Sequence, residues 1–355
     1  MRFIETFCVG FRNIKPCRLT WRQGLNVLTG SNGAGKTNVL ESLNILSGWG
    51  PFGGAKISQL LSWRYADSTA PVAALSCVAS GERDARVDVK LTSRASLRLN
   101  GEAASYSDIR MSVPSLSFLP GDVNLLDGTP AVRRLFLDKV CALVSPLYAR
   151  RRAEYRRLIR QRTSILRGAY TSSNSIALRA SVVPLVQLGS WIREVRAQVL
   201  EMIQSDMKLK DALFMTLSLD FRGYPDMERG FYELRERELH ARAVLVGPHR
   251  DDVVFTVSGG ANKGRLAGEA FSRGQKRRAV IEIILAAGRL IEKKLRAAPI
   301  LLLDDVCAEL DEAAKRETTE ALAATGWQVF VTSASADFDP RALWSVKDGE
   351  ITPYF

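Results

Sequence analysis

The 355-residue sequence has few histidines, no paired cysteines and no long apolar runs, and each shortage excludes a class of protein. Its two histidines and five scattered cysteines include no Cys-x-x-Cys pair, so we expect neither a zinc site nor a disulfide framework. No run approaches the roughly 20 apolar residues of a membrane span, and no signal-peptide core follows Met1. The sequence therefore predicts a soluble, cytoplasmic protein.

Acidic residues are too few to balance the basic ones. Fifty Lys and Arg stand against 38 Asp and Glu, which leaves a net charge of +12. A basic surface favours a polyanionic partner, because contact with a phosphate backbone releases counterions. Since 46% of the residues are hydrophobic and 25% charged, the chain is globular, and its length suits about two structural units.

Hydrophobic periodicity separates two β/α-rich ends from a helical middle. The predicted strands cover residues 3–9, 25–28, 72–78, 86–91, 300–303 and 329–332. The predicted helices cover residues 37–46, 131–169, 182–211, 273–296 and 311–323. This order predicts an α/β protein: a discontinuous head, residues 1–125 and 213–355, with an inserted helical arm at residues 126–212.

The strongest motif is Gly30-Ser31-Asn32-Gly33-Ala34-Gly35-Lys36-Thr37, a complete GxxxxGK[S/T] between a predicted strand and a predicted helix. Its glycines allow backbone N–H groups to point at phosphate oxygens, and the helix N-terminus favours negative charge. Lys36 is expected to contact the β- and γ-phosphates, and the Thr37 hydroxyl to ligate Mg²⁺. The motif predicts an ATP site with Mg²⁺.

A second motif ends a wholly apolar predicted strand, Pro299-Ile300-Leu301-Leu302-Leu303-Asp304-Asp305. A strand buried on both faces that ends in carboxylates would place Asp304 beside Mg²⁺ and Asp305 where it orients or deprotonates the attacking water. The simpler interpretation is a core strand closed by a turn. The upstream phosphate loop favours the catalytic interpretation, with Asp305 and Lys36 as catalytic residues.

The third motif, Phe271-Ser272-Arg273-Gly274-Gln275, opens a predicted helix. A serine followed by a glycine at a helix start presents a hydroxyl and unpaired N–H groups to an anion. Ser272 could equally be a simple N-cap. Because one chain already holds its phosphates at residues 30–37, we expect Ser272 and Gly274 to contact the γ-phosphate bound by a second subunit.

Taken in order, these motifs and the following Ala308-Glu309-Leu310-Asp311 resemble the ABC-type ATPase heads of SMC and Rad50 proteins, and most closely the RecF family. Three further segments look like tags of that family. They are Phe11-Arg12-Asn13, Arg133-Arg134-Leu135-Phe136-Leu137-Asp138 and Val246-Gly247-Pro248-His249-Arg250-Asp251-Asp252. The resemblance covers essentially the whole chain.

The resemblance implies an ABC-type P-loop head with a mixed β-sheet and an inserted helical arm. It implies a weak ATPase that forms a homodimer on ATP, binds duplex DNA near single-stranded gaps without reading sequence, and helps to load recombinase with RecR and RecO. Ser272 and Gly274 would contact the γ-phosphate across the dimer, Gln275 would be a further nucleotide-binding residue, and Asp311 would lie at the dimer seam.

The sequence departs from the general ABC pattern at three places. Asp305 stands where ABC heads usually have Glu, as in RecF-like proteins, and its shorter side chain predicts slow turnover. The segment at residues 118–122 has no Gln, so Asp122 either acts through water or belongs to a turn. Residues 331–333 offer hydroxyls in place of a switch histidine, which leaves the role of Ser333 open.

The predicted arm begins with a basic segment in which eight arginines accompany a single acid, Glu154. This surplus favours contact with a polyanion or with an acidic protein, although a solvated helix face is the simpler interpretation. The candidate DNA contacts are Arg150, Arg151, Arg152, Arg156, Arg157 and Arg160. His249 lies in a Gly-Pro turn and is expected to be a buried, hydrogen-bonded residue.

Two other functions fit parts of the pattern. An SMC- or Rad50-like DNA tether would need long heptad runs, and the predicted arm helices are short for this. The nucleotide-binding subunit of an ABC transporter would share the ATP motifs, but it would not need the basic arm.

Overall fold

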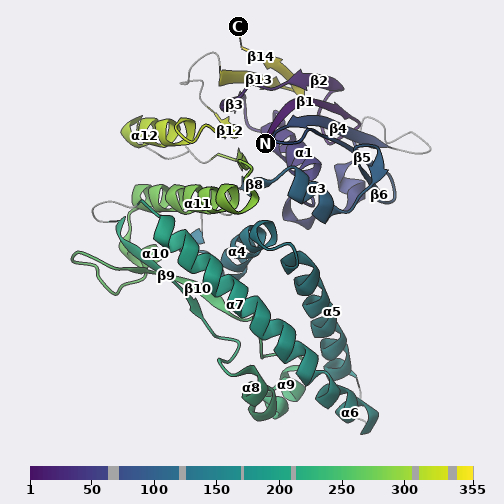
Figure 1. The fold of residues 1–355 in the computed structure, drawn as a ribbon, viewed down its shortest axis with the longest axis vertical. Helices are drawn as coiled ribbons and strands as arrows, with labels where there is room; N and C mark the ends of the chain where they lie inside the picture. The colour runs from purple at the N-terminus through teal and green to yellow at the C-terminus, as the bar shows by residue number, and fades with distance from the viewer. Residues whose placement is uncertain are drawn as a thin grey trace. The chain divides into compact units, whose positions relative to one another are not determined.

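The computed structural model describes residues 1–62, 72–119, 125–168, 172–208, 213–305, 312–334 and 342–354. The chain divides into two compact units (Figure 1). The first unit contains Met1–Val123 and Arg273–Phe355, and the second contains Asn124–Ser272.

One layer of the first unit is a six-stranded sheet in the order β14-β13-β3-β12-β11-β8. Its strands are β3 (Leu25–Thr29), β8 (Ser115–Phe118), β11 (Ile300–Leu303), β12 (Val329–Ser333), β13 (Leu343–Lys347) and β14 (Glu350–Pro353). All neighbours are parallel except β13 and β14. The carboxyl ends of β3, β11 and β12 therefore meet at one edge, which is where ligands bind in open α/β sheets.

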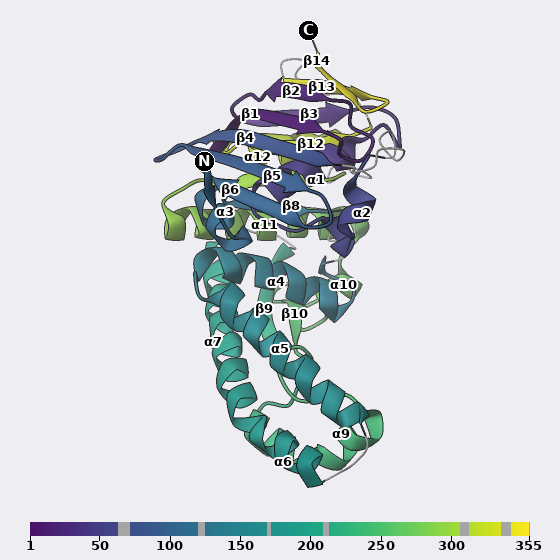
Figure 2. The ribbon, with the colours of Figure 1, turned by 90° about the vertical axis from the view of Figure 1, so that its right-hand side faces the viewer.

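The other layer is an antiparallel sheet in the order β2-β1-β4-β5-β6-β7. Its strands are β1 (Arg2–Val9), β2 (Cys17–Thr20), β4 (Ala73–Ser80), β5 (Ala85–Leu91), β6 (Ala95–Leu99) and β7 (Glu102–Ala103). Helix α1 (Lys36–Leu46) contacts strands of both sheets and lies between them (Figure 2). Its fully buried Leu40 and Leu43 join both layers into one core.

Further helices complete the first unit. They are the 3-10 turn Phe52–Gly54, α2 (Ile57–Leu60), α3 (Tyr106–Ser112), α11 (Arg273–Leu295) and α12 (Glu312–Ala323). Helix α11 packs against α12, and its apolar face is buried from Ala279 to Ile291. The strand predicted at residues 300–303 is present with those bounds, and the helix predicted at 273–296 ends one residue earlier.

The second unit is built on four successive helices and an antiparallel pair of strands. The helices are α4 (Pro130–Val144), α5 (Tyr148–Arg167), α6 (Ser172–Ala180) and α7 (Val182–Asp206). Helices α5 and α7 run side by side, and α8 (Met227–Glu233) and α9 (Arg235–Ala241) pack on them (Figure 2). Strands β9 (Met215–Asp220) and β10 (Asp252–Val257) pair antiparallel, and α10 (Ala267–Ala270) follows.

The structure divides the chain elsewhere than the sequence suggested. The predicted head segment began at residue 213, but residues 213–272 belong to the second unit. The reason is packing, because β9 contacts α7 while β10 contacts α4. A return of strand periodicity after residue 213 did not reveal which sheet or helices those strands would join.

The helical stretch Asn174–Asp206 is long and apolar enough to cross a membrane by length and composition alone, which run length had not indicated. It comprises two helices, and its Arg193 and Arg196 are only 7% and 4% exposed. Each forms an ion pair with an aspartate of the same unit. The buried side of α7 therefore carries charges that are paired within the second unit.

Candidate nucleotide site

The phosphate-loop motif lies where the sequence predicted, between β3 and α1 at the carboxyl edge of the parallel sheet. Gly35 is the N-cap of α1 and has a φ of 116°, in the left-handed region. At Gly30, with a φ of 154°, a Cβ would lie 2.1 Å from the carbonyl oxygen of Val346. Glycine is therefore required at both positions, because an L side chain would clash or be strained there.

The Lys36 side chain folds along the loop. Its Nζ donates to the carbonyl oxygens of Gly30, at 2.6 Å, and Ser31, at 3.1 Å. These bonds hold the ammonium over the loop where the motif requires a cation for phosphate.

A residue that sequence reasoning left without a role braces the other side of the loop. The Asn13 side-chain amide donates to the carbonyl oxygen of Ala34 at 3.3 Å, and its Oδ1 accepts from Asn38 Nδ2 at 2.8 Å. The preceding Arg12 donates from Nε and Nη2 to the buried Glu41 of α1, at 2.8 and 3.0 Å. The Phe11-Arg12-Asn13 tag was therefore the sequence feature that could have revealed this role. Its side chains fix the phosphate loop relative to α1.

Two threonines bracket Asp304 at the end of β11. Thr37 Oγ1 donates to Asp304 Oδ2 at 2.8 Å, and Thr332 Oγ1 donates to Asp304 Oδ1 at 2.6 Å. The carboxylate is 4% exposed. Thr37 and Asp304 are 267 positions apart in the sequence, and the parallel register of β3, β12 and β11 brings them together.

The neighbouring carboxylate is held differently. Asp305 is exposed and has a φ of 55°. Its backbone N–H donates to Thr332 Oγ1 at 2.8 Å. One hydroxyl therefore fixes both aspartates, and it is supplied by Thr332 rather than by Ser333, which is buried at the end of β12.

These groups line a cavity of about 440 Å³. Its lining residues are Asn32, Gly33, Gly35, Lys36, Thr37, Asn38, Asp304, Asp305, Thr332 and Ala334. Within the described residues no three His, Cys, Asp or Glu side chains converge as a metal cage. A hydroxyl and a carboxylate oxygen in contact nevertheless fit Mg²⁺, which prefers oxygen ligands and takes its remaining ones from phosphates and water.

The signature residues span the point in the sequence where the second unit ends and the last segment of the first begins. Ser272 is the last residue of the second unit, and Gly274 and Gln275 occupy the first turn of α11. Asp311 and Asp122, the other expected contacts, lie outside the described residues.

The six candidate DNA contacts on α5 do not share one environment. Arg151 stacks on Trp191, with its guanidinium carbon 4.4 Å from the ring centre, and Arg152 pairs with Asp138 at 2.7 Å. The other four, Arg150, Arg156, Arg157 and Arg160, are exposed. Arg151 and Arg152 are therefore part of the packing of the second unit, which charge counting along the sequence did not reveal.

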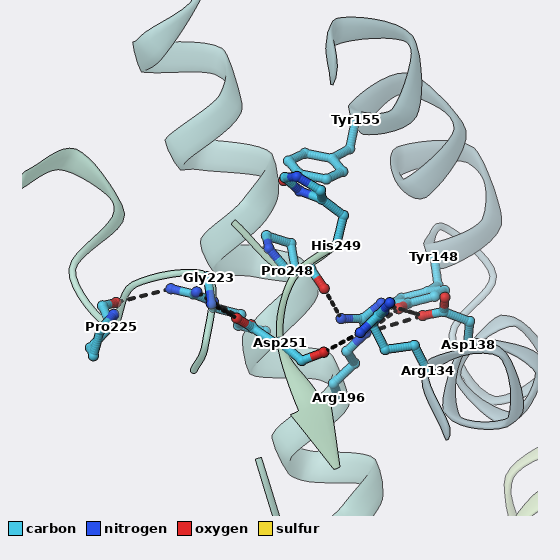
Figure 3. Close-up of polar contacts among 11 residues, drawn as sticks. Arg134, Asp138, Tyr148, Tyr155, Arg196, Gly223, Pro225, Pro248, His249 and Asp251 are labelled. Atoms are coloured by element: carbon cyan, nitrogen blue, oxygen red, sulfur yellow. Dashed lines mark hydrogen bonds and ion pairs between the residues drawn. The ribbon is translucent and has the colours of Figure 1, made fainter. Parts of the chain in front are cut away.

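The two longer tags both bind arginines of α7 inside the second unit (Figure 3). Asp138 of the first tag accepts from Arg196 at 2.8 Å and from the Tyr148 hydroxyl. Asp251 of the second tag accepts both Nε and Nη2 of Arg193, at 2.7 and 2.8 Å. Burial alone would lower the pKa of Arg196, but Asp138 and Tyr148 outweigh it and raise that pKa.

Arginines of the first tag close the network. Arg133 binds Asp252 through Nε and Nη2 at 2.7 and 2.8 Å, and Arg134 donates to the carbonyl oxygen of Asp251 at 2.6 Å. These contacts join α4 to the start of β10.

His249 is hydrogen-bonded, as predicted, but only half-buried. Its Nδ1 lies 2.8 Å from the Tyr155 hydroxyl, and its Nε2 lies 3.2 Å from the carbonyl oxygen of Val244. Burial lowers the pKa of His249 to about 4, so the imidazole is neutral at pH 7.

Comparison with known proteins covers nearly the whole chain. The family model described as "RecF/RecN/SMC N terminal domain" matches residues 3–342. The DNA replication and repair protein RecF of Moorella thermoacetica is 33% identical over 345 residues, which span 94% of this chain and 90% of that protein.

Two solved structures show the fold. The recombination mediator protein RecF of the RecFOR pathway, in the form named RecF-ATPrS, aligns with a TM-score of 0.83 at 23% identity, over 99% of this chain and 97% of that one. The form named RecF-ATP aligns with a TM-score of 0.80 at 23% identity, over 99% and 96%. The predicted fold class, an ABC-type head with a mixed sheet and an inserted helical subdomain, is confirmed.

Proposed function

The chain belongs to the RecF family, as its motifs predicted, and from this membership we propose that it is an ATP-dependent switch in DNA replication and repair. The family consists of ABC-type ATPases, and proteins of this name act in replication and repair. The finer proposal is that ATP binding closes a homodimer on duplex DNA beside single-stranded gaps, and that slow hydrolysis reopens it.

The observation that carries this proposal is the cavity at the carboxyl edge of the parallel sheet. There, one ammonium, two hydroxyls and two carboxylates converge from α1, β12 and the end of β11. Lys36 would neutralise β- and γ-phosphate charge, and Asp305 would orient the attacking water and accept its proton. Thr37 and Asp304 would hold Mg²⁺, which would neutralise charge on the phosphate oxygens.

The first turn of α11 supports the proposal of a nucleotide shared between two subunits. A Cβ at Gly274 would meet no atom of the described chain within 4 Å, and its φ is not in the left-handed region. Glycine in a helix costs about 1 kcal/mol relative to alanine, so this chain's own packing gives no reason for it. Close approach of a phosphate bound by a second subunit would explain why glycine stands at this position.

Ser272→Arg tests this arrangement. The variant should bind ATP with an unchanged Kd, because the phosphate loop is untouched, but the long cationic side chain should prevent pairing of the heads. Sedimentation velocity with ATP, ADP and no nucleotide measures the dimer fraction. The exposed Arg94→Ala on the hairpin between β5 and β6 is the control. Normal ATP-dependent dimerisation of Ser272→Arg would refute the contact, and equal dimer fractions of the unmodified protein in all three conditions would refute the switch.

Arginines on the outer side of α5 are the proposed contacts to the DNA backbone. Arg150, Arg157 and Arg160 are exposed and follow a seven- and three-residue spacing, which places them on one side of the helix. With no carboxylate ion pair to any of them in the described part of the chain, they are available to phosphates. Such contacts would be independent of DNA sequence.

The double variant Arg157→Glu/Arg160→Glu should weaken binding to every duplex alike. Loss of two phosphate contacts should make the negative slope of log Kobs against log salt shallower by about 2. Fluorescence anisotropy with one duplex at several salt concentrations measures that slope. Arg86→Glu/Arg98→Glu, an equal charge reversal on the first unit, is the control. An unaltered slope in the α5 variant alone would place the DNA surface elsewhere.

Family resemblance further suggests RecR and RecO as partners, loading of recombinase as the outcome, and the cytoplasm as the location. The alternatives fit less well. Helix α5 has 20 residues and α7 has 25, so they reach about 30–40 Å, far short of a tethering coiled coil. A transporter subunit would not need the arginines on the outer side of α5.

A further inference from the structure

A second cavity lies wholly within the second unit, between α4, α5, α7 and the loop that precedes β10. Its volume is about 370 Å³. Four arginines line it, Arg134, Arg152, Arg156 and Arg196, together with a single carboxylate, Asp138. His249 also lines it and is neutral at pH 7, so positive charge is in excess. We call this the arginine pocket.

Two of the four guanidinium groups are already paired. Asp138 accepts from Arg196 at 2.8 Å and lies 2.7 Å from Arg152 Nε. Arg196 also donates to the carbonyl oxygen of Pro248 at 2.7 Å (Figure 3). Asp138 accepts from Tyr148 as well, so its two oxygens have no capacity for a further guanidinium.

The other two guanidinium groups lack a carboxylate partner within the described residues. Arg134 makes one hydrogen bond, to the carbonyl oxygen of Asp251 at 2.6 Å, and retains N–H donors on the pocket side. Arg156 has neither an ion pair nor a hydrogen bond to the described chain. Burial, followed by repulsion from Arg196, lowers the pKa of Arg134, although nearby aspartates partly offset both. An anion bound beside Arg134 would offset this repulsion, and Arg156 lines the same pocket.

The rest of the wall is apolar. Ala131, Leu135, Ile192 and Pro248 line the same cavity, and the Leu135 side chain is 47% exposed at its edge. The phosphates of a duplex would gain nothing from contact with an exposed leucine. A peptide with a carboxylate beside an apolar side chain would contact both the arginines and the apolar wall. Arg156 lines this pocket, whereas Arg150, Arg157 and Arg160 do not.

We propose that the arginine pocket is a docking site for an acidic peptide segment of a partner protein. A carboxylate of that segment would bind Arg134 and Arg156, and a neighbouring apolar side chain would pack on Leu135 and Ile192. Charge-assisted bonds from guanidinium to carboxylate are the strong, directional ones, so they would fix the peptide's position, while the apolar contact would distinguish it from other anions. The site is separate from the nucleotide cavity and does not depend on ATP.

Selection from a library of random decapeptides on the full-length protein, with counter-selection on Arg134→Glu/Arg156→Glu, tests the proposal. The enriched peptides should combine Asp or Glu with an aliphatic or aromatic residue. Anisotropy with the strongest labelled peptide should then show about tenfold weaker binding to Arg156→Glu and about threefold weaker binding to Leu135→Ser. Arg156 has no contact to lose, so its variant should fold normally.

Arg167→Glu, the same charge reversal at the exposed end of α5, is the matched control and should bind the peptide within about twofold of the unmodified protein. Enrichment of no peptide, or of peptides that bind Arg156→Glu equally well, would overturn the proposal. The proposal would also be overturned if the pocket bound duplex DNA instead. In that case no peptide would bind, Arg156→Glu would weaken DNA binding, and Leu135→Ser would leave DNA binding unchanged. Sensitivity to both Arg156→Glu and Leu135→Ser, with Arg167→Glu unaffected, would establish it.

Discussion

Asp305→Asn should reduce the rate of ATP hydrolysis by about 10²- to 10⁴-fold while leaving the Kd for ATP almost unchanged. The amide keeps the size of the carboxylate but cannot accept a proton from the attacking water. It also suits the backbone, because Asp305 has a φ of 55° and asparagine tolerates the left-handed region better than most residues. Single-turnover hydrolysis and equilibrium binding of labelled ATP separate the two effects, and the variant should accumulate as an ATP-bound dimer.

Asp304→Asn is the paired control for this experiment. Asp304 is nearly buried and contacts Thr37 and Thr332, so its variant should lose Mg²⁺-dependent nucleotide affinity as well as hydrolysis. The two neighbouring substitutions should therefore differ in binding and agree in turnover. If Asp305→Asn hydrolyses ATP at the normal rate, another group orients the water.

Asp138→Ala should destabilise the second unit by about 3–5 kcal/mol. The substitution removes the carboxylate that Arg196 and Arg152 share and leaves the Arg196 guanidinium, 4% exposed, without its counter-charge. Amide hydrogen exchange measured on peptides of α4 and α7 reports the stability of the second unit separately from that of the first. Their slowest-exchanging amides should lose most of their protection.

Two further variants distinguish the effect of this buried ion pair from that of an exposed ion pair. Asp88→Ala breaks the exposed pair with Arg86 and should cost less than about 1 kcal/mol. Asp138→Leu/Arg196→Met removes both charges and should recover much of the lost stability. The loss of amide protection in α7 of Asp138→Ala is compared with the loss in β4 and β5 of Asp88→Ala. If the first loss is no larger than the second, the ion pairs of Asp138 are unimportant for stability.

Local parts of the nucleotide site could be predicted from the sequence, and parts assembled through the fold could not. The phosphate loop is a strand, a turn and a helix in succession, so its spacing alone carries its geometry. Thr332 lies 28 positions from Asp304, and only the parallel pairing of β12 with β11 makes it a partner. Asn13 reaches the loop in a similar way, from 21 positions before Ala34.

The pattern of charges along the sequence likewise did not reveal which arginines form ion pairs. The arginines of α5 are indistinguishable in sequence, yet Arg152 pairs with Asp138 and Arg162 with Glu238, 76 positions away. Helical periodicity predicts which residues share a side, but the partners come from helices and loops far along the chain. The boundary expected at residue 213 was wrong for that reason, since β9 and β10 are strands that pack on helices of the second unit.

The first unit is assembled from the two ends of the chain, and this constrains the order in which the protein can form on the ribosome. Strand β3 leaves the exit tunnel with its phosphate loop long before β11 and β12 are translated, so the loop has no sheet neighbours during most of synthesis. The second unit is continuous and can fold in that interval. The nucleotide cavity is therefore complete only after β11 and β12 have been translated, and a chain that stops before them lacks Asp304, Asp305 and Thr332.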